Sequence, residues 1–493
     1  MKYKIIALLS IAIAFATVYF VQNHEPESNR YHQHLQARHY TPCTHHGDEV
    51  FCTHLPIISI KTDGPMPEPF LNEKVEKNEN RDGWRNYERV EATVSCYDSP
   101  NSNNHLTDKA VLEEKARVRY RGASSRELAK KGYAVSFCEE DGITTKDVSL
   151  SGMAADDDWA LHGPFMDKTM IRNYMWYNIS SEIMEYAPEV RFCELFVNEE
   201  YQGLYLIVEK IKRNDEGRLK LEKSNPKSEI TSFIGVIDRK IDDPTTKIEP
   251  FSDYMDLSGT QGEMGGQFEI LYPSKTLTQA QHDYVESYIS KMEKAIYSFD
   301  YRNPKKGFRA YLDEKSFTDY YIINEFTSNF DAMKLSTYFY KDVRGKLKLA
   351  VWDFNATFFY SLNDIYKFNT IWYKYLFKDE KFTQNVVNRY KELRTNILSE
   401  EYLIQYIDDT LAYLGPAIQR NQDRWKDSYG SQFEVETKLN DGKFWTHEEA
   451  VKQLKEAIKE RGNFLDKNIE NLYILCHDSM NKKYNYVEGR TFG

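Results

Sequence analysis

The sequence predicts a two-lobed α+β protein, with a strand-rich N-terminal lobe over 55–235 and a helix-rich C-terminal lobe over 236–476. In the first half, short apolar segments are separated by polar loops, as in a series of strands. From Thr278 onward, apolar residues recur at helical spacing instead. The chain has 493 residues, enough for two lobes, and its 14% of aromatic residues favours a folded protein.

The elements of the first lobe can be predicted in chain order. Apolar segments predict strands over 55–60, 90–97, 116–120 and 133–137. Asp167 is a good N-cap for a helix that runs to about Met184, and every fourth residue from Ile171 to Ile183 is apolar. A β-hairpin is expected next, over 191–197 and 204–211.

The second lobe begins with a helix whose start is marked in the sequence. Thr278 and Gln281 have the spacing of a capping box, and apolar residues continue at helical spacing to Ile296. A second helix is predicted over about 313–329, and a β-pair over 337–341 and 347–352. The remainder to about Tyr473 is mostly helical, and 477–493 is expected to be a flexible tail.

Residues 1–22 are expected to form a membrane anchor or a signal segment. Ile5 to Val21 carry no charge and follow a basic flank. This run is shorter than the roughly 20 apolar residues that span a bilayer and longer than a signal-peptide core, so an uncleaved anchor is favoured but a cleaved signal stays open. The basic flank should remain cytoplasmic, which predicts that the rest of the chain is membrane-anchored outside the cytoplasm, or secreted after cleavage.

Residues 23–54 are polar and rich in histidine, and they are predicted to form a linker. Cys43 and Cys52 bracket a short loop, so in an oxidising compartment a local disulfide is the simplest interpretation. A zinc site is the second interpretation, although the spacing matches no standard zinc module. Its further ligands would come from three nearby histidines: His45, His46 and His54.

Two acidic residues, far apart in the chain, carry the candidate chemistry. Asp331 follows a predicted helix, and Asp353 follows a predicted strand in a Trp-Asp-Phe-Asn segment. Phosphoryl transfer needs one carboxylate to position the attacking hydroxyl and another to hold Mg²⁺ on the phosphates. The Asp-Phe-Asn segment also echoes the Asp-Phe-Gly element of protein kinases. The alternative interpretation is a solvated loop aspartate and an unrelated aspartate at a strand end.

A basic turn between two predicted strands is the second candidate segment. Glycine and serine there can present backbone N–H and hydroxyl groups to phosphates, and a lysine at the start of the next strand can reach them. The segment contains no Walker-type signature, and an ordinary hairpin with a solvated basic end is the alternative. The candidate phosphate-binding residues are Arg121, Ser124, Ser125, Lys130 and Lys131.

Taken together and in order, these segments resemble the spore coat protein H family, the CotH-type atypical protein kinases. The resemblance covers roughly 55–360. Five motifs in the same order are more specific than any one of them. They are 121–125 with 130–133, 167–173, 198–205 with Glu209, Asp331 with 338–342, and 352–355.

The resemblance implies a protein-kinase-like fold, ATP with Mg²⁺ or Mn²⁺, and transfer of the γ-phosphate to Ser or Thr of exported or surface proteins. Asp331 would be the catalytic carboxylate, and Asp353 would be the metal ligand, assisted by Asn355 and Ser336. Lys131 would bind the phosphates, with Glu182 as its ion-pair partner. The other nucleotide-binding candidates are Arg121, Ser124, Ser125, Lys130 and Glu209.

The chain departs from the kinase pattern at two metal-binding positions. Ser336 stands where kinases have a metal-binding Asn, and Asn355 stands where the family usually has a second acid. A non-catalytic surface or coat scaffold is therefore the alternative function. The expected partners are a protein substrate and, through residues 1–22, a membrane. Nucleic acid is excluded as a partner because the net charge is −11.

Overall fold

The computed structural model describes residues 30–43, 50–70, 86–239, 243–254, 266–359, 362–365, 367–428 and 446–476. The predicted membrane or signal segment, 1–22, and the predicted tail, 477–493, lie outside these ranges. Among the described residues, no helix has both the length and the apolar character needed to cross a bilayer.

The strand-rich half forms a closed seven-stranded barrel with the order β1-β2-β3-β4-β5-β7-β6. Its strands are β1 (Ile57–Thr62), β2 (Val90–Tyr97), β3 (Leu112–Arg121), β4 (Gly132–Phe137), β5 (Asp158–His162), β6 (Val190–Val197) and β7 (Glu200–Glu209). Neighbouring strands are antiparallel except β1 and β6, whose parallel pairing from Ile57 to Ile60 closes the ring. The predicted mixed class is thus confirmed, but the strand-rich part is a closed barrel rather than an ordinary kinase lobe.

A second sheet has the strand order β12-β11-β8-β10-β9. Its strands are β8 (Phe233–Asp238), β9 (Lys247–Ile248), β10 (Gln267–Tyr272), β11 (Thr337–Lys341) and β12 (Lys348–Ala350). The expected lobe boundary at 235/236 falls inside β8, which pairs only with strands of this second sheet. Helices α4 (Gln279–Tyr297) and α5 (Glu314–Phe326) belong to this half, and the predicted capping box of Thr278 and Gln281 is present.

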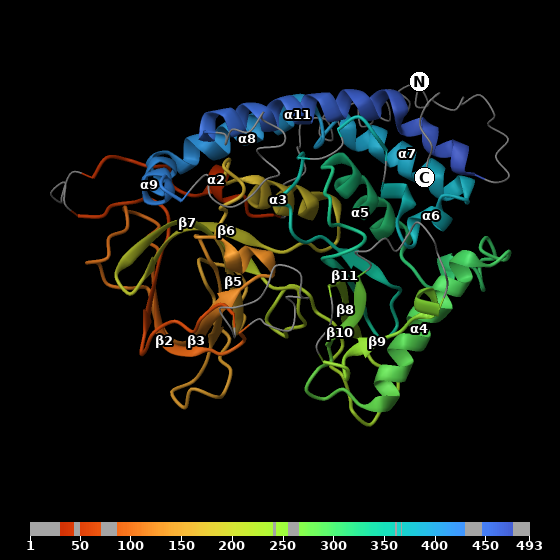
Figure 1. Cartoon of the computed structure of the whole chain (residues 1–493), viewed down its shortest axis with the longest axis horizontal. Coiled ribbons are helices and arrows are strands. Elements are labelled where there is room, and N and C mark those ends of the chain that lie inside the picture. The colour runs from red at the N-terminus through yellow and green to blue at the C-terminus, as the bar shows by residue number, and fades with distance from the viewer. Residues whose placement is uncertain are drawn as a thin grey trace, which may run out of the picture.

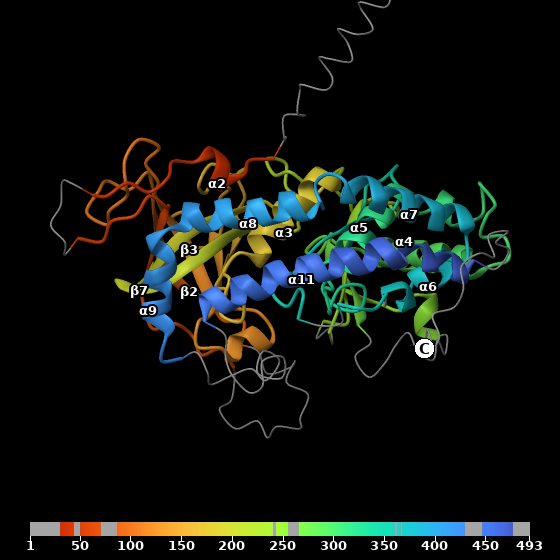
Figure 2. The ribbon, with the colours of Figure 1, turned by 90° about the horizontal axis from the view of Figure 1, so that it is seen from above.

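A layer of helices covers both sheets (Figures 1 and 2). It consists of α7 (Glu380–Arg394), α8 (Glu400–Leu414), α9 (Pro416–Trp425) and α11 (His447–Asn468). Seen from above, α8 and α11 run side by side, with α9 over the barrel end and α7 over the other half (Figure 2). Shorter helices are α2 (Gln33–Gln36), η2 (Ser124–Glu127), η3 (Phe251–Tyr254), η4 (Phe308–Ala310), η5 (Lys367–Asn369), α6 (Tyr373–Leu376) and η6 (Ile469–Leu475).

Helix α3 (Arg172–Ile183) lies between the barrel and the helical layer and is buried on nearly all sides. Its first residue is Arg172, five positions later than the predicted cap. Asp167 still organises this start, because its carboxylate accepts hydrogen bonds from the backbone N–H of Arg172 (2.9 Å) and of Thr169 (3.1 Å). The intervening residues form a turn, so the cap acts from outside the helix.

The described part of residues 23–54 is packed against the fold and is not a loose linker. Arg30, His32, Gln33 and His34 are all buried. Arg30 donates to Asn178 of α3 (2.9 Å), so this segment belongs to the core of the protein. Cys43 and Cys52 are both thiols in this structure, so it does not contain the disulfide predicted within this segment.

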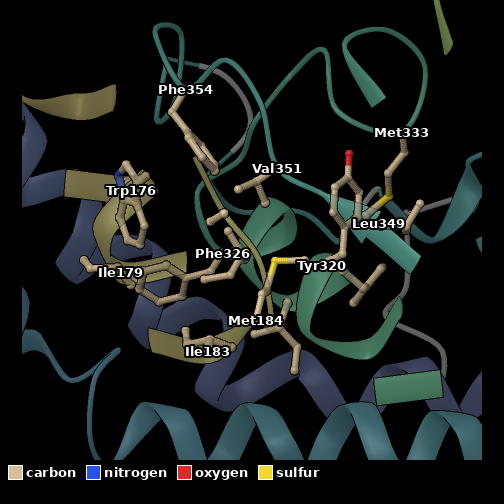
Figure 3. Packing of buried hydrophobic residues seen from close by; sticks show 14 of the residues in the cluster. Trp176, Ile179, Ile183, Met184, Tyr320, Phe326, Met333, Leu349, Val351 and Phe354 are labelled. Carbon is tan, nitrogen blue, oxygen red and sulfur yellow. The ribbon is translucent and has the colours of Figure 1, made fainter. Parts of the chain in front are cut away.

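The main apolar core lies where α3, α5 and the ends of the second sheet meet. Figure 3 shows Trp176 of α3 and Phe326 of α5 packed beside Val351 and Phe354. Met333 projects into the same core from the loop after α5. Phe354 directly follows Asp353, and Met333 lies two residues after Asp331. The packed core therefore holds both acid-bearing segments in place.

Candidate active site

A cleft of about 420 Å³ opens between the barrel and the second sheet. Side chains reach it from the β3–β4 turn, the end of β5, α3, the end of β8, the loop after α5 and the segment after β12. The polar lining residues are Arg121, Ser125, His162, Asn173, Tyr177, Asp238, Arg239, Asn329, Asp331, Ser336, Tyr338, Trp352, Asp353 and Asn355, with Gly122 between the first two. We refer to this cavity as the acidic cleft. It unites six of the residues proposed from sequence, from both halves of the chain.

The backbone of Asp353 is held in a left-handed conformation, with φ +56°. This conformation is uncommon for a residue with a side chain, and it persists only where the surroundings fix it. Here the N–H of Asp353 donates to the Tyr177 hydroxyl (3.1 Å), and its carbonyl accepts from Asn329 Nδ2 (3.1 Å). The N–H of Phe354 donates to Asn173 Oδ1 (2.7 Å). The turn therefore aims the Asp353 carboxylate into the cleft.

A chain of amides orients the same carboxylate. Asn173 Nδ2 donates to Asn355 Oδ1 (2.8 Å), and Asn355 Nδ2 donates to Asp353 Oδ1 (2.5 Å). Asn355 thus has one amide atom engaged by α3 and the other engaged by the acid. Its contribution in this arrangement is to position Asp353 as well as to line the cleft.

The loop that carries Asp331 is anchored from a distant segment. Lys367 Nζ donates to the carbonyls of Phe330 (3.1 Å) and Ala332 (2.8 Å), the two residues that flank Asp331. The Asp331 carbonyl accepts from Leu335 N (2.8 Å), which closes a tight turn. Ser336 ends this turn with φ +50° and lines the cleft.

The electrostatics of the cleft favour a bound cation. Burial, and then the neighbouring Asp331, raise the pKa of Asp353 to about 6, with Asp238 acting in the same direction. The Asn355 N–H and Arg121 oppose this shift. A divalent cation bound beside such a buried carboxylate favours its ionised form. An oxygen donor set of this kind fits Mg²⁺ or Mn²⁺.

The β3–β4 turn forms the opposite wall of the cleft. Gly122 has φ +108°, and a Cβ atom there would lie 1.9 Å from Ser125 Oγ, so only glycine permits this close approach. The buried Arg126 side chain fixes the turn from behind through Gly122 O (2.8 Å) and Asn86 O (2.6 Å). Arg121 and Ser125 face the cleft from this turn, and Ser124 begins its η2 helix.

The two lysines proposed to bind phosphates do not line the cleft. Lys130 is fully buried, and its Nζ donates to Leu204 O and to Asn421 Oδ1, both at 2.6 Å. Lys131 donates to Arg126 O (2.7 Å) on the far side of the turn. Among the predicted cations, Arg121 is the one that reaches the cleft. Lys130 is drawn away from the cleft by partners that are distant in the chain, Leu204 of β7 and Asn421 of α9.

The two glutamates proposed for the nucleotide site have partners elsewhere. Glu182 pairs with His32 Nε2 (2.8 Å), so the expected ion pair with Lys131 is replaced by a contact with the N-terminal segment. Glu209 accepts from Glu189 N (2.8 Å) and pairs with Arg218 (3.2 Å). Neither glutamate lines the acidic cleft.

The polar lining residues that were not proposed from the sequence include His162, Asn173, Tyr177, Asp238 and Arg239. Asn173 and Tyr177 are four residues apart on α3 and so share one face, a pattern that polar residues in an apolar helix could have revealed. His162 Nε2 is buried and has no hydrogen-bond partner among the described residues. Burial and the nearby Arg121 lower the pKa of His162 to about 3, so the imidazole is neutral and can accept from a ligand.

A mixed fold in which a glycine turn and two acid-bearing loops meet in one cleft has some of the parts that kinase-like proteins use for phosphoryl transfer. The chain belongs to the CotH kinase protein family, whose pattern matches residues 118–465. It is also similar to the inner spore coat protein H of Bacillus subtilis (strain 168), with 22% identity over 306 residues. That match covers 59% of this chain and 73% of the relative.

Proposed function

We propose that this protein is an atypical kinase that transfers the γ-phosphate of ATP to Ser or Thr hydroxyls of exported or surface proteins. The observation that supports this most is the meeting of Asp331 and Asp353 with the Gly122 turn in one cleft. Family membership supports kinase-like chemistry independently. The name of the Bacillus relative, an inner spore coat protein, supports a location outside the cytoplasm.

In this proposal, the phosphates bind against the β3–β4 turn. Arg121 supplies the positive charge and Ser125 a hydroxyl donor, while Gly122 lets the backbone come close to the ligand. Arg121 thus takes the role first assigned to Lys131. A guanidinium is well suited to it, because it remains charged and can donate two parallel hydrogen bonds to a phosphate.

The divalent ion would be held by Asp353, with Asn355 and Ser336 as weaker oxygen donors. When bound, Mg²⁺ or Mn²⁺ would neutralise the charge of the phosphates during transfer. Asp331 then has a separate role. Its carboxylate orients the acceptor hydroxyl and accepts its proton, while the side chains of the β3–β4 turn keep the phosphates in line.

The alternative function is a non-catalytic scaffold, and one observation favours it. Both amide atoms of Asn355 are already hydrogen-bonded, to Asn173 and to Asp353. Together with Ser336 in the usual place of a metal-binding Asn, this leaves fewer strong metal ligands than in ordinary kinases. Anchoring through residues 1–22 would suit either function.

The test measures phosphoryl transfer by the full chain, with labelled ATP, Mn²⁺ or Mg²⁺ and dephosphorylated casein, and compares wild type with Asp331→Asn. Asparagine keeps the size of the side chain but cannot take a proton. We expect transfer to fall at least ~10²-fold. Nucleotide affinity, measured by calorimetry, should stay within about threefold, which is under about 1 kcal/mol.

Equal rates for wild type and Asp331→Asn would show that Asp331 is structural and that this mechanism is wrong. If wild type transfers no phosphate to casein or to itself with either metal, yet binds nucleotide, the scaffold function is supported instead. The calorimetry separates the two cases because it does not depend on an acceptor.

A further inference from the structure

Cys43, Cys52 and His105 meet beside the loop between β2 and β3. One donor atom from each lies within 4.8 Å of the other two. Cys43 Sγ is 3.2 Å from His105 Nε2. The imidazole is buried, and the two thiols are half-buried. None of the three residues lines the acidic cleft, so this cluster has no part in the proposed kinase chemistry.

Backbone hydrogen bonds hold the two segments of this cluster together. Thr53 and Asn104 form an isolated antiparallel bridge, with Thr53 N to Asn104 O at 3.2 Å and Asn104 N to Thr53 O at 2.6 Å. Cys52 and His105 are the immediate neighbours of these bridged residues. The fold therefore fixes the positions of Cys52 and His105, two of the three residues of the cluster.

Polar side chains around the cluster prepare it for a ligand. Asp108 Oδ2 lies 3.1 Å from His105 Nδ1 and also accepts from the His105 N–H (2.8 Å). An ionised carboxylate only accepts hydrogen bonds, so Nδ1 carries the proton and the Nε2 lone pair points toward the cysteines. Burial raises the pKa of the Cys52 thiol, and the hydrogen bond that Asn103 Nδ2 donates to Cys52 Sγ (3.2 Å) acts in the opposite direction. A carboxylate behind a histidine and a donor on a sulfur are both typical of metal sites.

We propose that Cys43, Cys52 and His105 bind one Zn²⁺ ion, with water as the fourth ligand. Two thiolates and a neutral imidazole form a donor set that zinc prefers, and their charge balances that of the ion. Binding would release the two thiol protons. The ion would join the segment before β1 to the β2–β3 loop.

The histidines first considered for such a site are not the ones brought to it. His54 Nε2 lies 2.6 Å from Tyr413 O, and His45 and His46 lie outside the described residues. A Cys43–Cys52 disulfide is the competing state of the same residues. It would remove both sulfur ligands, and it would give no role to the contact between His105 and the sulfur or to Asp108.

The test uses the full chain, purified with reductant, freed of metal and titrated with Zn²⁺ against a chromophoric chelator. Wild type should bind one ion, and Co²⁺ in its place should give a thiolate-to-cobalt absorption band. Cys52→Ser and His105→Ala should each abolish stoichiometric binding. Asp108→Asn should keep the band but weaken affinity by ~10–100-fold. Cys138→Ala, at a buried thiol in β-bridge contact with Thr145, is the matched control and should bind as wild type does.

Circular dichroism of each metal-free variant separates loss of a ligand from loss of the fold. If a cysteine variant is unfolded, the zinc affinity of Asp108→Asn decides the proposal in its place. Reduced wild type that retains no Zn²⁺ would overturn the proposal. So would a Cys52→Ser variant that binds Zn²⁺ as tightly as wild type does. A Cys43–Cys52 disulfide in protein isolated from its own compartment without reductant would also overturn it.

Discussion

Asp353 combines a left-handed backbone with a carboxylate that is costly to ionise. Its pKa is raised to about 6, mainly by burial and then by Asp331, whereas an aspartate in an unfolded chain has a pKa near 3.9. The folded protein therefore binds this proton more tightly than the unfolded chain does. Ionised Asp353 lowers stability above about pH 6, and the cost disappears as the pH falls through about 4.

The cost of ionising Asp353 leads to a prediction for the stability of the metal-free protein. Asp353→Asn keeps an acceptor for Asn355 and removes the charge, so it should raise the free energy of unfolding at pH 7.5 by roughly 1–2 kcal/mol, a value reduced for the water that enters the cleft. The gain should vanish near pH 4. Denaturant melts of both proteins in a chelator, at several pH values, measure this difference. A variant less stable than wild type at pH 7.5 would contradict it.

At the residue scale, the candidates that reach the cleft are those whose direction is set by a local turn. Asp331, Asp353 and Ser125 each lie in a short segment whose own turn aims the side chain into the cleft. Lys130 could not be assigned correctly, because its direction depends on Asn421, which lies 291 residues away. The predicted ion pair of Glu182 with Lys131 was wrong for the same reason, a partner that is distant in the chain. That partner is His32, in a segment that was predicted to be a linker.

At the element scale, the β3–β4 turn depends on one glycine. Gly122→Ala adds a Cβ that would meet Ser125 Oγ at 1.9 Å in a backbone with φ +108°. We expect nucleotide affinity to fall at least ~10-fold, because the turn must shift away from the phosphates it would bind. Calorimetric titration with ATP and Mn²⁺ measures the loss.

Gly142→Ala is the matched control for this change. It also has a positive φ, of +68°, but its nearest neighbour is the Glu91 side chain, far from the lining of the cleft. It should cost stability of about 1–2 kcal/mol without changing nucleotide affinity. If both variants bind ATP as wild type does, the β3–β4 turn is not the phosphate site.

The anchoring of the Asp331 loop by Lys367 leads to a second prediction at the element scale. Lys367→Met removes the donor that holds the carbonyls of Phe330 and Ala332. The acid should then be misplaced by a fraction of an ångström to an ångström, so transfer should fall by ~10–10²-fold with little change in nucleotide affinity. The control is Lys378→Met, at a partly buried lysine that packs on Tyr375 (4.1 Å) instead. Equal transfer rates for the two variants would mean that Lys367 does not position the loop.

Most strands and helices followed from local pattern, but the barrel did not. β5 was missed because its five residues lie in a stretch dominated by aspartates, from Asp156 to Asp158. Closure depends on the parallel pairing of β1 with β6, and these strands are separated by more than 120 residues. A parallel contact over that distance leaves no periodic signal in either strand.

At the scale of the whole molecule, the segment before β1 ties the barrel to the helical layer. His32 contacts both Glu182 of α3 (2.8 Å) and Tyr406 of α8 (3.1 Å). Its histidines and lack of apolar periodicity are typical of a linker, and no local pattern indicates that polar side chains are buried here. The partners of Arg30, His32 and Gln33 lie more than 140 residues away, so only the complete fold supplies them.

A substitution of Gln33 is the most direct test of whether the segment before β1 ties the barrel to the helical layer. Its amide accepts from Phe192 N (2.7 Å) and donates to Phe192 O (3.2 Å), so it completes the edge of β6 where β1 has not yet begun. Gln33→Ala leaves two buried backbone groups without a partner, and it should lower the free energy of unfolding by about 2–4 kcal/mol. Gln36→Ala, on the exposed side of the same helix, should change it by less than about 0.5 kcal/mol. Denaturant melts and limited proteolysis of both variants should rank them in this order. If they are equally stable, the segment covers the barrel without holding it to the helices.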